Sequence, residues 1–80
     1  MQPHEIKAAL EAAIADSEVD AATEGNHAHV TVVSPVFEGL SPVKKQQLVY
    51  GALREAIASG VIHAVHMKTY TPAEWAALQN

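Results

Sequence analysis

The chain has 80 residues, of which 49% are hydrophobic and 18% charged, and its formal net charge is −4 with histidine neutral. A chain of this size suits one domain, here residues 1–80, with a thin core and no deep enclosed active site. The absence of cysteine excludes disulfides, thiolate zinc sites and any iron–sulfur cluster held by the chain's own sulfur. No apolar run approaches the roughly 20 residues of a membrane span, so we expect a cytoplasmic protein without membrane contact.

The first half of the chain predicts a helix followed by a β-hairpin. Pro3 suits a first helical turn, and apolar residues at helical spacing follow it, so the helix is expected to run to residue 15. A weak strand is expected at 18–23, and a stronger, β-branched strand at 29–33. The Gly-Asn pair at 25–26 is a turn signal, which favours an antiparallel hairpin.

The second half predicts a long helix, one strand and a short terminal helix. Ser-Pro at 41–42 is a good helix start, and the helix is expected to reach residue 58. Gly51 lies inside this helix, where glycine is unfavourable, so it is interpreted as a point of close contact. The last strand is predicted at 61–69, and Thr71 is expected to cap the helix that follows.

This order of elements is α-β-β-α-β-α. The long helix between the second and third strands is a crossover, so those two strands can lie parallel. The sequence therefore predicts an α+β fold in which helices pack on one face of a three-stranded mixed sheet.

The five histidines are the candidate groups for metal binding or proton transfer. His27 and His29 are two residues apart, so their side chains should share one face of a strand. His63 and His66 should lie on opposite faces, and the strand pattern alone favours a histidine at the edge of the core for His63. No nucleophile motif, carboxylate pair or phosphate loop is present, so we expect no enzyme.

A nucleic-acid interface is the alternative that the residues themselves support. Lys44 and Lys45 lie near the start of the long helix, beyond a loop that contains Phe37 and Gly39. A helix N-terminus with lysines and free backbone amides can bind phosphate. The acidic net charge and the few aromatic residues argue against this interpretation.

Three segments resemble the BolA family, in its short IbaG/YrbA-like branch. They are the turn Phe37-Glu38-Gly39, the helix motif VKKQQLVY at 43–50, and the strand at 62–65 with the segment YTPAEW at 70–75. The resemblance covers nearly the whole chain. It departs from the family at Pro42, where arginine is usual, which removes one positive charge beside Lys44 and Lys45.

The resemblance implies a fold like the second class of KH domains and a role in iron or redox stress regulation. It also implies pairing with a monothiol glutaredoxin, with which the chain would share a [2Fe-2S] cluster and glutathione. His63 matches the family's cluster ligand, and His27 matches a recurring histidine at the start of the second strand. The chain alone should bind no cluster. DNA binding, a weak homodimer and a purely acid-responsive role for the histidines stay open.

Overall fold

A computed structural model describes residues 1–79 of the chain. None of the helices in this range is both long and apolar enough to cross a membrane. The elements in chain order are α1 (Pro3–Ala13), β1 (Glu18–Glu24), β2 (His27–Val33), the 3₁₀ turn η1 (Pro35–Phe37), α2 (Pro42–Ala52), α3 (Arg54–Ala58), β3 (Ala64–Tyr70) and α4 (Pro72–Gln79).

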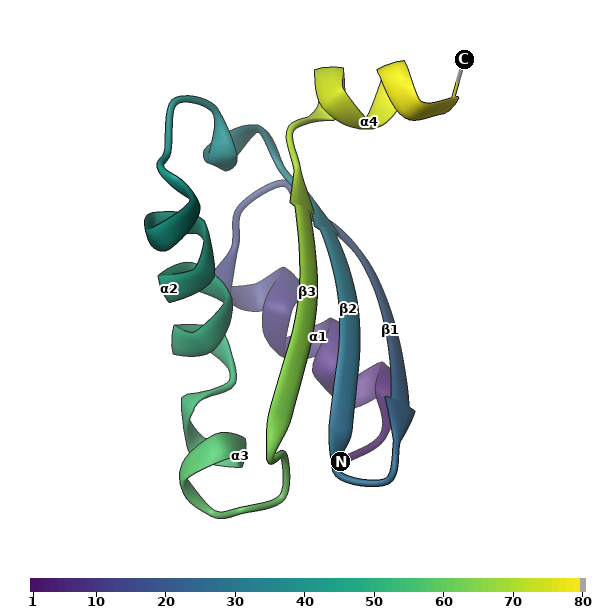
Figure 1. Cartoon of the computed structure of the whole chain (residues 1–80), viewed down its shortest axis with the longest axis vertical. Helices are drawn as coiled ribbons and strands as arrows, with labels where there is room; N and C mark the ends of the chain where they lie inside the picture. Colours follow the sequence, from purple (N-terminus) through teal and green to yellow (C-terminus); the bar gives the residue numbers. More distant parts are fainter. Residues whose placement is uncertain (80) are drawn as a thin grey trace.

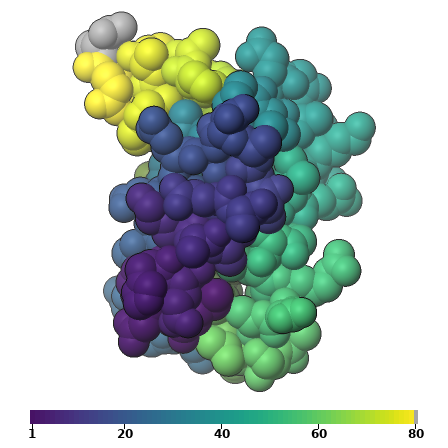
Figure 2. Space-filling model, turned by 180° about the vertical axis from the view of Figure 1, so that it is seen from behind, coloured from purple at the N-terminus to yellow at the C-terminus, as the bar shows by residue number. Residues whose placement is uncertain are grey.

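The three strands form one mixed sheet in the order β1-β2-β3, with β2 antiparallel to β1 and parallel to β3. α1 and α2 lie against one face of this sheet, and Figure 1 shows the opposite, open face in front of α1. From behind, α1 and the α2–α3 segment lie side by side over the covered face (Figure 2). The predicted α+β fold, its hairpin and its parallel crossover are confirmed.

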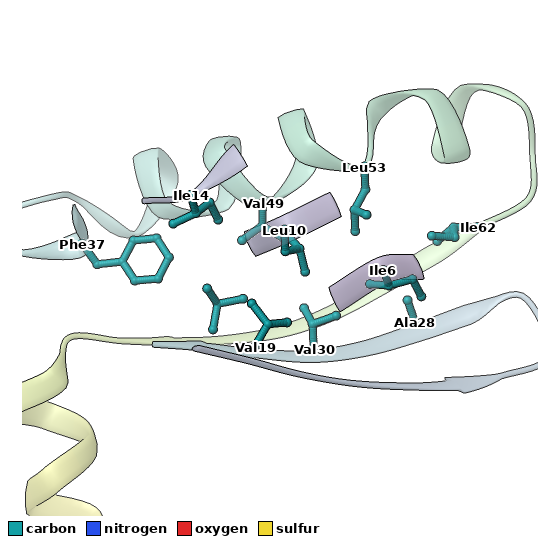
Figure 3. Close-up of a cluster of buried hydrophobic side chains, with 11 residues drawn as sticks. Ile6, Leu10, Ile14, Val19, Ala28, Val30, Phe37, Val49, Leu53 and Ile62 are labelled. Atoms are coloured by element: carbon teal, nitrogen blue, oxygen red, sulfur yellow. The ribbon is translucent and has the colours of Figure 1, made fainter. Parts of the chain in front are cut away.

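The core lies between the sheet and the helices (Figure 3). Alternate residues of β2 face it because strand side chains alternate between the two faces. The buried residues of this cluster are Ile6, Leu10, Ile14, Val19, Ala28, Val30, Val32, Phe37, Val49, Leu53 and Ile62. Burial of these apolar side chains supplies most of the stability of the fold.

The predicted long helix is broken at Leu53, where φ is −110° and ψ is 13°. The backbone N–H of Leu53 donates to the carbonyl of Tyr50 at 3.1 Å, a 3₁₀-type bond that resets the helical register. Leu53 is buried on the core side of this break. The interpretation of Gly51 as a close contact is wrong, because a Cβ atom at this position would meet nothing within 4 Å.

β3 begins at Ala64, three residues later than predicted. Gly60 adopts a positive φ of 81°, which turns the chain after α3. The N–H of Ile62 then donates to the carbonyl of Ala56 at 3.1 Å, and its side chain is buried in the core. His63 therefore lies in a bend before the strand.

α4 begins with the predicted capping box. The Thr71 hydroxyl accepts from the N–H of Glu74 at 3.2 Å, and the Glu74 carboxylate accepts from the N–H of Thr71 at 2.8 Å. This helix leaves the helical layer: it lies beyond the Tyr70 end of the sheet, on the opposite side from α1 and α2 (Figures 1 and 3). Trp75 packs on Tyr70, with ring centroids 5.4 Å apart.

Candidate functional site

His63 is an exposed side chain on a tethered backbone. Its N–H donates to the carbonyl of Asn26, in the β1–β2 turn, at 2.8 Å. Its Nε2 atom lies 3.7 Å from the position that a Cβ atom on Gly60 would occupy. The interpretation of His63 as a core-edge histidine is wrong, because Ile62 turns into the core and leaves His63 in solvent.

His27 lies at the same end of the sheet. It follows Asn26 directly, begins β2 and pairs in register with Ala64. Its side chain is exposed on the open face, and its Nδ1 lies 3.2 Å from Nε2 of His66. When Nδ1 of His27 carries the proton and donates to His66, its Nε2 offers a free lone pair to a ligand.

Three histidines form a stack on the open face, made of His27, His66 and His29. The ring centroids of His29 and His66 are 4.6 Å apart with planes at 11°, and those of His27 and His66 are 5.4 Å apart at 14°. The shared face of His27 and His29 is confirmed. Across residues 1–79, no group of three or more histidine, cysteine or acidic residues is placed to hold a metal ion.

His66 is the member of this stack that the sequence analysis did not place there. It joins the other two because His29 and His66 are register partners across the parallel β2–β3 pair. This register could not be predicted from the identity or spacing of the histidines. The whole crossover segment separates the two strands in the sequence, so no local pattern relates them.

The residues of the nucleic-acid alternative do not form one surface. Phe37 is 1% exposed, so its assignment to an interface is corrected to a core role. Gly39 and Lys44 are exposed, whereas Lys45 is half-buried. The hydrogen bonds from the backbone and side chain of Thr71 lower the pKa of Glu74, and the charge of Lys45 lowers it further. The charge of Lys45 therefore already favours the ionised form of a nearby carboxylate.

A family profile described as "BolA-like protein" matches residues 3–74. The chain is 50% identical over 76 residues to the acid stress protein IbaG of Escherichia coli K12, an alignment that covers 95% of this chain and 90% of that protein. The resemblance predicted from the three motifs is confirmed.

Solved structures give the same result. A bolA protein homologue from Coxiella burnetii superposes with a TM-score of 0.83 at 38% identity, covering 95% of this chain and 97% of that one. The BolA domain of SufE1 from Arabidopsis thaliana gives a TM-score of 0.80 at 29% identity, covering 90% and 93% of the two chains. Sequence and fold together place the chain in the BolA family, in its IbaG-like branch.

Proposed function

We propose that this chain is a non-enzymatic partner of a monothiol glutaredoxin, to which it contributes one histidine ligand of a shared [2Fe-2S] cluster. The observation that carries the proposal is the position of His63: an exposed imidazole whose backbone is tied to the hairpin turn. Membership of the BolA family supports this class of role. The acid stress relative supports a place in stress regulation.

The donor chemistry of the chain fits a shared cluster. A neutral imidazole nitrogen is an accepted iron ligand, and histidine in place of thiolate raises the reduction potential of a [2Fe-2S] centre. The chain contains no cysteine, so a glutaredoxin and glutathione would supply the thiolates. Because protonation competes with metal binding at imidazole, the bond from His63 would weaken on acidification.

His27 is the second candidate ligand from this chain. The hydrogen bond between Asn26 and His63 holds the hairpin turn and the bend before β3 together, so both candidates face the same end of the sheet. His66 would act on His27 through the Nδ1 contact at 3.2 Å. A partner on the second ring nitrogen fixes the tautomer and orientation of a ligating histidine.

Reconstitution with a monothiol glutaredoxin, glutathione, iron and sulfide tests the proposal. The wild-type chain should change the visible circular dichroism of the glutaredoxin cluster, and His63→Ala should remove that change. His4→Ala is the matched control, because His4 is an exposed histidine on α1. A wild-type chain that forms no complex, or a His63→Ala variant with the wild-type spectrum, would contradict the proposal.

DNA binding remains the second candidate function. Its support is the exposure of Lys44, in the first turn of α2, and of Gly39, in the loop that precedes this helix. Phosphate contacts should make the affinity fall steeply with salt. Titration with single- and double-stranded DNA should then show salt-dependent binding that Lys44→Glu weakens. A dissociation constant in the millimolar range that is the same for the wild type and Lys44→Glu would reject this function.

A further inference from the structure

β1 is an edge strand with a charged outer side. In the sheet of residues 1–79 it pairs only with β2. An edge strand presents backbone N–H and carbonyl groups that can pair with another extended segment. Glu18 and Asp20 are exposed on this strand and, being two residues apart, project on the same, open face.

A groove of about 420 Å³ runs along this edge. Trp75 and Val33 line it at the α4 end, and Glu18 and Asp20 line it along β1. A smaller hollow of about 200 Å³ shares Glu18, Val33 and Trp75, which makes the apolar end continuous. Figure 1 shows α4 extending beyond the end of the sheet on the β1 side.

The charge of the groove is predominantly negative. α1 contributes Lys7 and Glu11 to its rim, and these two pair with each other at 4.0 Å. Within residues 1–79, neither Glu18 nor Asp20 has a basic side chain within the 4.0 Å of an ion pair. The groove therefore combines a free strand edge, two carboxylates at strand spacing that lack an ion-pair partner within 4.0 Å, and the half-buried side chain of Trp75 as an aromatic wall.

We propose that this β1 groove binds an extended basic segment of a partner protein by strand addition to β1. Lysine or arginine at alternate positions would face Glu18 and Asp20, since side chains of paired strands share the same period of two. A cation at the α4 end would lie against the indole of Trp75. A second copy of this chain is a poor occupant, because pairing two β1 edges would oppose their acidic side chains.

The groove is separate from the candidate cluster ligands. Glu18 pairs with Val33 at the end of β2, whereas His27 begins β2 and His63 precedes β3. The two surfaces thus lie at opposite ends of the sheet. Binding in the groove does not require His63, and it can be tested in the chain alone.

Trp75 is the only tryptophan, so its fluorescence reports on the groove directly. The probe is a blocked eight-residue peptide in which lysine and threonine alternate. A blocked peptide with four lysines followed by four threonines has the same composition and charge. The alternating peptide should shift the Trp75 emission, shift the amide resonances of β1, and bind about tenfold more tightly than the block peptide. Equal binding of the two peptides, equal binding of spermidine, or no binding would overturn the proposal.

Variants that neutralise acidic side chains test whether the peptide binds in the β1 groove. Glu18→Gln with Asp20→Asn should weaken the alternating peptide about tenfold, the size expected for two surface ion pairs. Glu38→Gln with Glu55→Gln changes the net charge equally at exposed positions outside the groove, and should leave the affinity within about twofold. Equal losses in both double variants would show attraction by net charge alone and would overturn the proposal.

Discussion

The two faces of β2 differ in their exposure to solvent: one packs against the helices and the other is open. Ala28, Val30 and Val32 face the helices and are buried in the core. His27 and His29 alternate with them and lie exposed on the open face. One strand therefore packs against the core on one side and leaves its other side in solvent, because a single layer of helices covers only one side of the sheet. Functional side chains could vary on the open face with little cost to stability.

The largest difference between the two faces is expected when one aromatic side chain is truncated on each side of the sheet. Phe37→Ala should lower the free energy of unfolding by about 3–5 kcal/mol, because it empties a fully buried site. His29→Ala should change it by about 0.5 kcal/mol or less, since the ring is exposed. Urea unfolding followed by circular dichroism measures both. Similar losses in the two variants would contradict this difference.

A smaller loss is expected for a buried polar contact beside the covered face. Ser34 is 0% exposed; its hydroxyl donates to the carbonyl of Ala15 at 2.8 Å and accepts from the N–H of Val36 at 3.1 Å. Ser34→Ala leaves both groups unpaired and should cost about 1–3 kcal/mol. Ser59→Ala is the control, because its hydroxyl bonds an exposed carbonyl. An equal cost for the two serines in urea unfolding would be the contrary outcome.

The smallest expected effect lies outside both faces, at α4. The N–H and hydroxyl of Thr71 bond the Glu74 carboxylate and hold its pKa below the usual range. Folding therefore favours the ionised form, so this stabilisation is present above the ordinary pKa of glutamate and is lost as pH falls through the lowered value. The protection of the α4 amides against exchange, relative to their intrinsic rates, should fall over that acidic window in the wild type. Glu74→Gln should lack this pH dependence; a variant that keeps it would refute the role of the cap.

The fold was predictable wherever the signal was local. Ser41 and Thr71 cap their helices as expected, and the β-branched segment at 29–33 lies in a strand as predicted. The break at Leu53 was not predictable, because it depends on how α2 and α3 both pack their apolar residues against the same core. The late start of β3 has a similar cause: Ile62 leaves the strand pattern to fill the core.

The candidate site was predictable only in part. His63 was singled out by its motif, and its exposure on a tethered bend had no local signal. Phe37 lies in a loop-like sequence, yet its side chain turns inward. The stack of His66 on His29 depends on the parallel register of two strands that are distant in the sequence. Such a register is set by packing of the whole sheet.

We propose that His63 supplies a nitrogen ligand to a cluster whose sulfurs belong to a partner. The most direct measurement is pulsed electron paramagnetic resonance of the reduced cluster in the reconstituted complex. The chain is labelled with ¹⁵N-histidine and the glutaredoxin is left unlabelled. The account predicts a ¹⁵N hyperfine coupling that His63→Ala removes and His4→Ala retains. A cluster without this coupling, or one whose coupling is unchanged in His63→Ala, would contradict it.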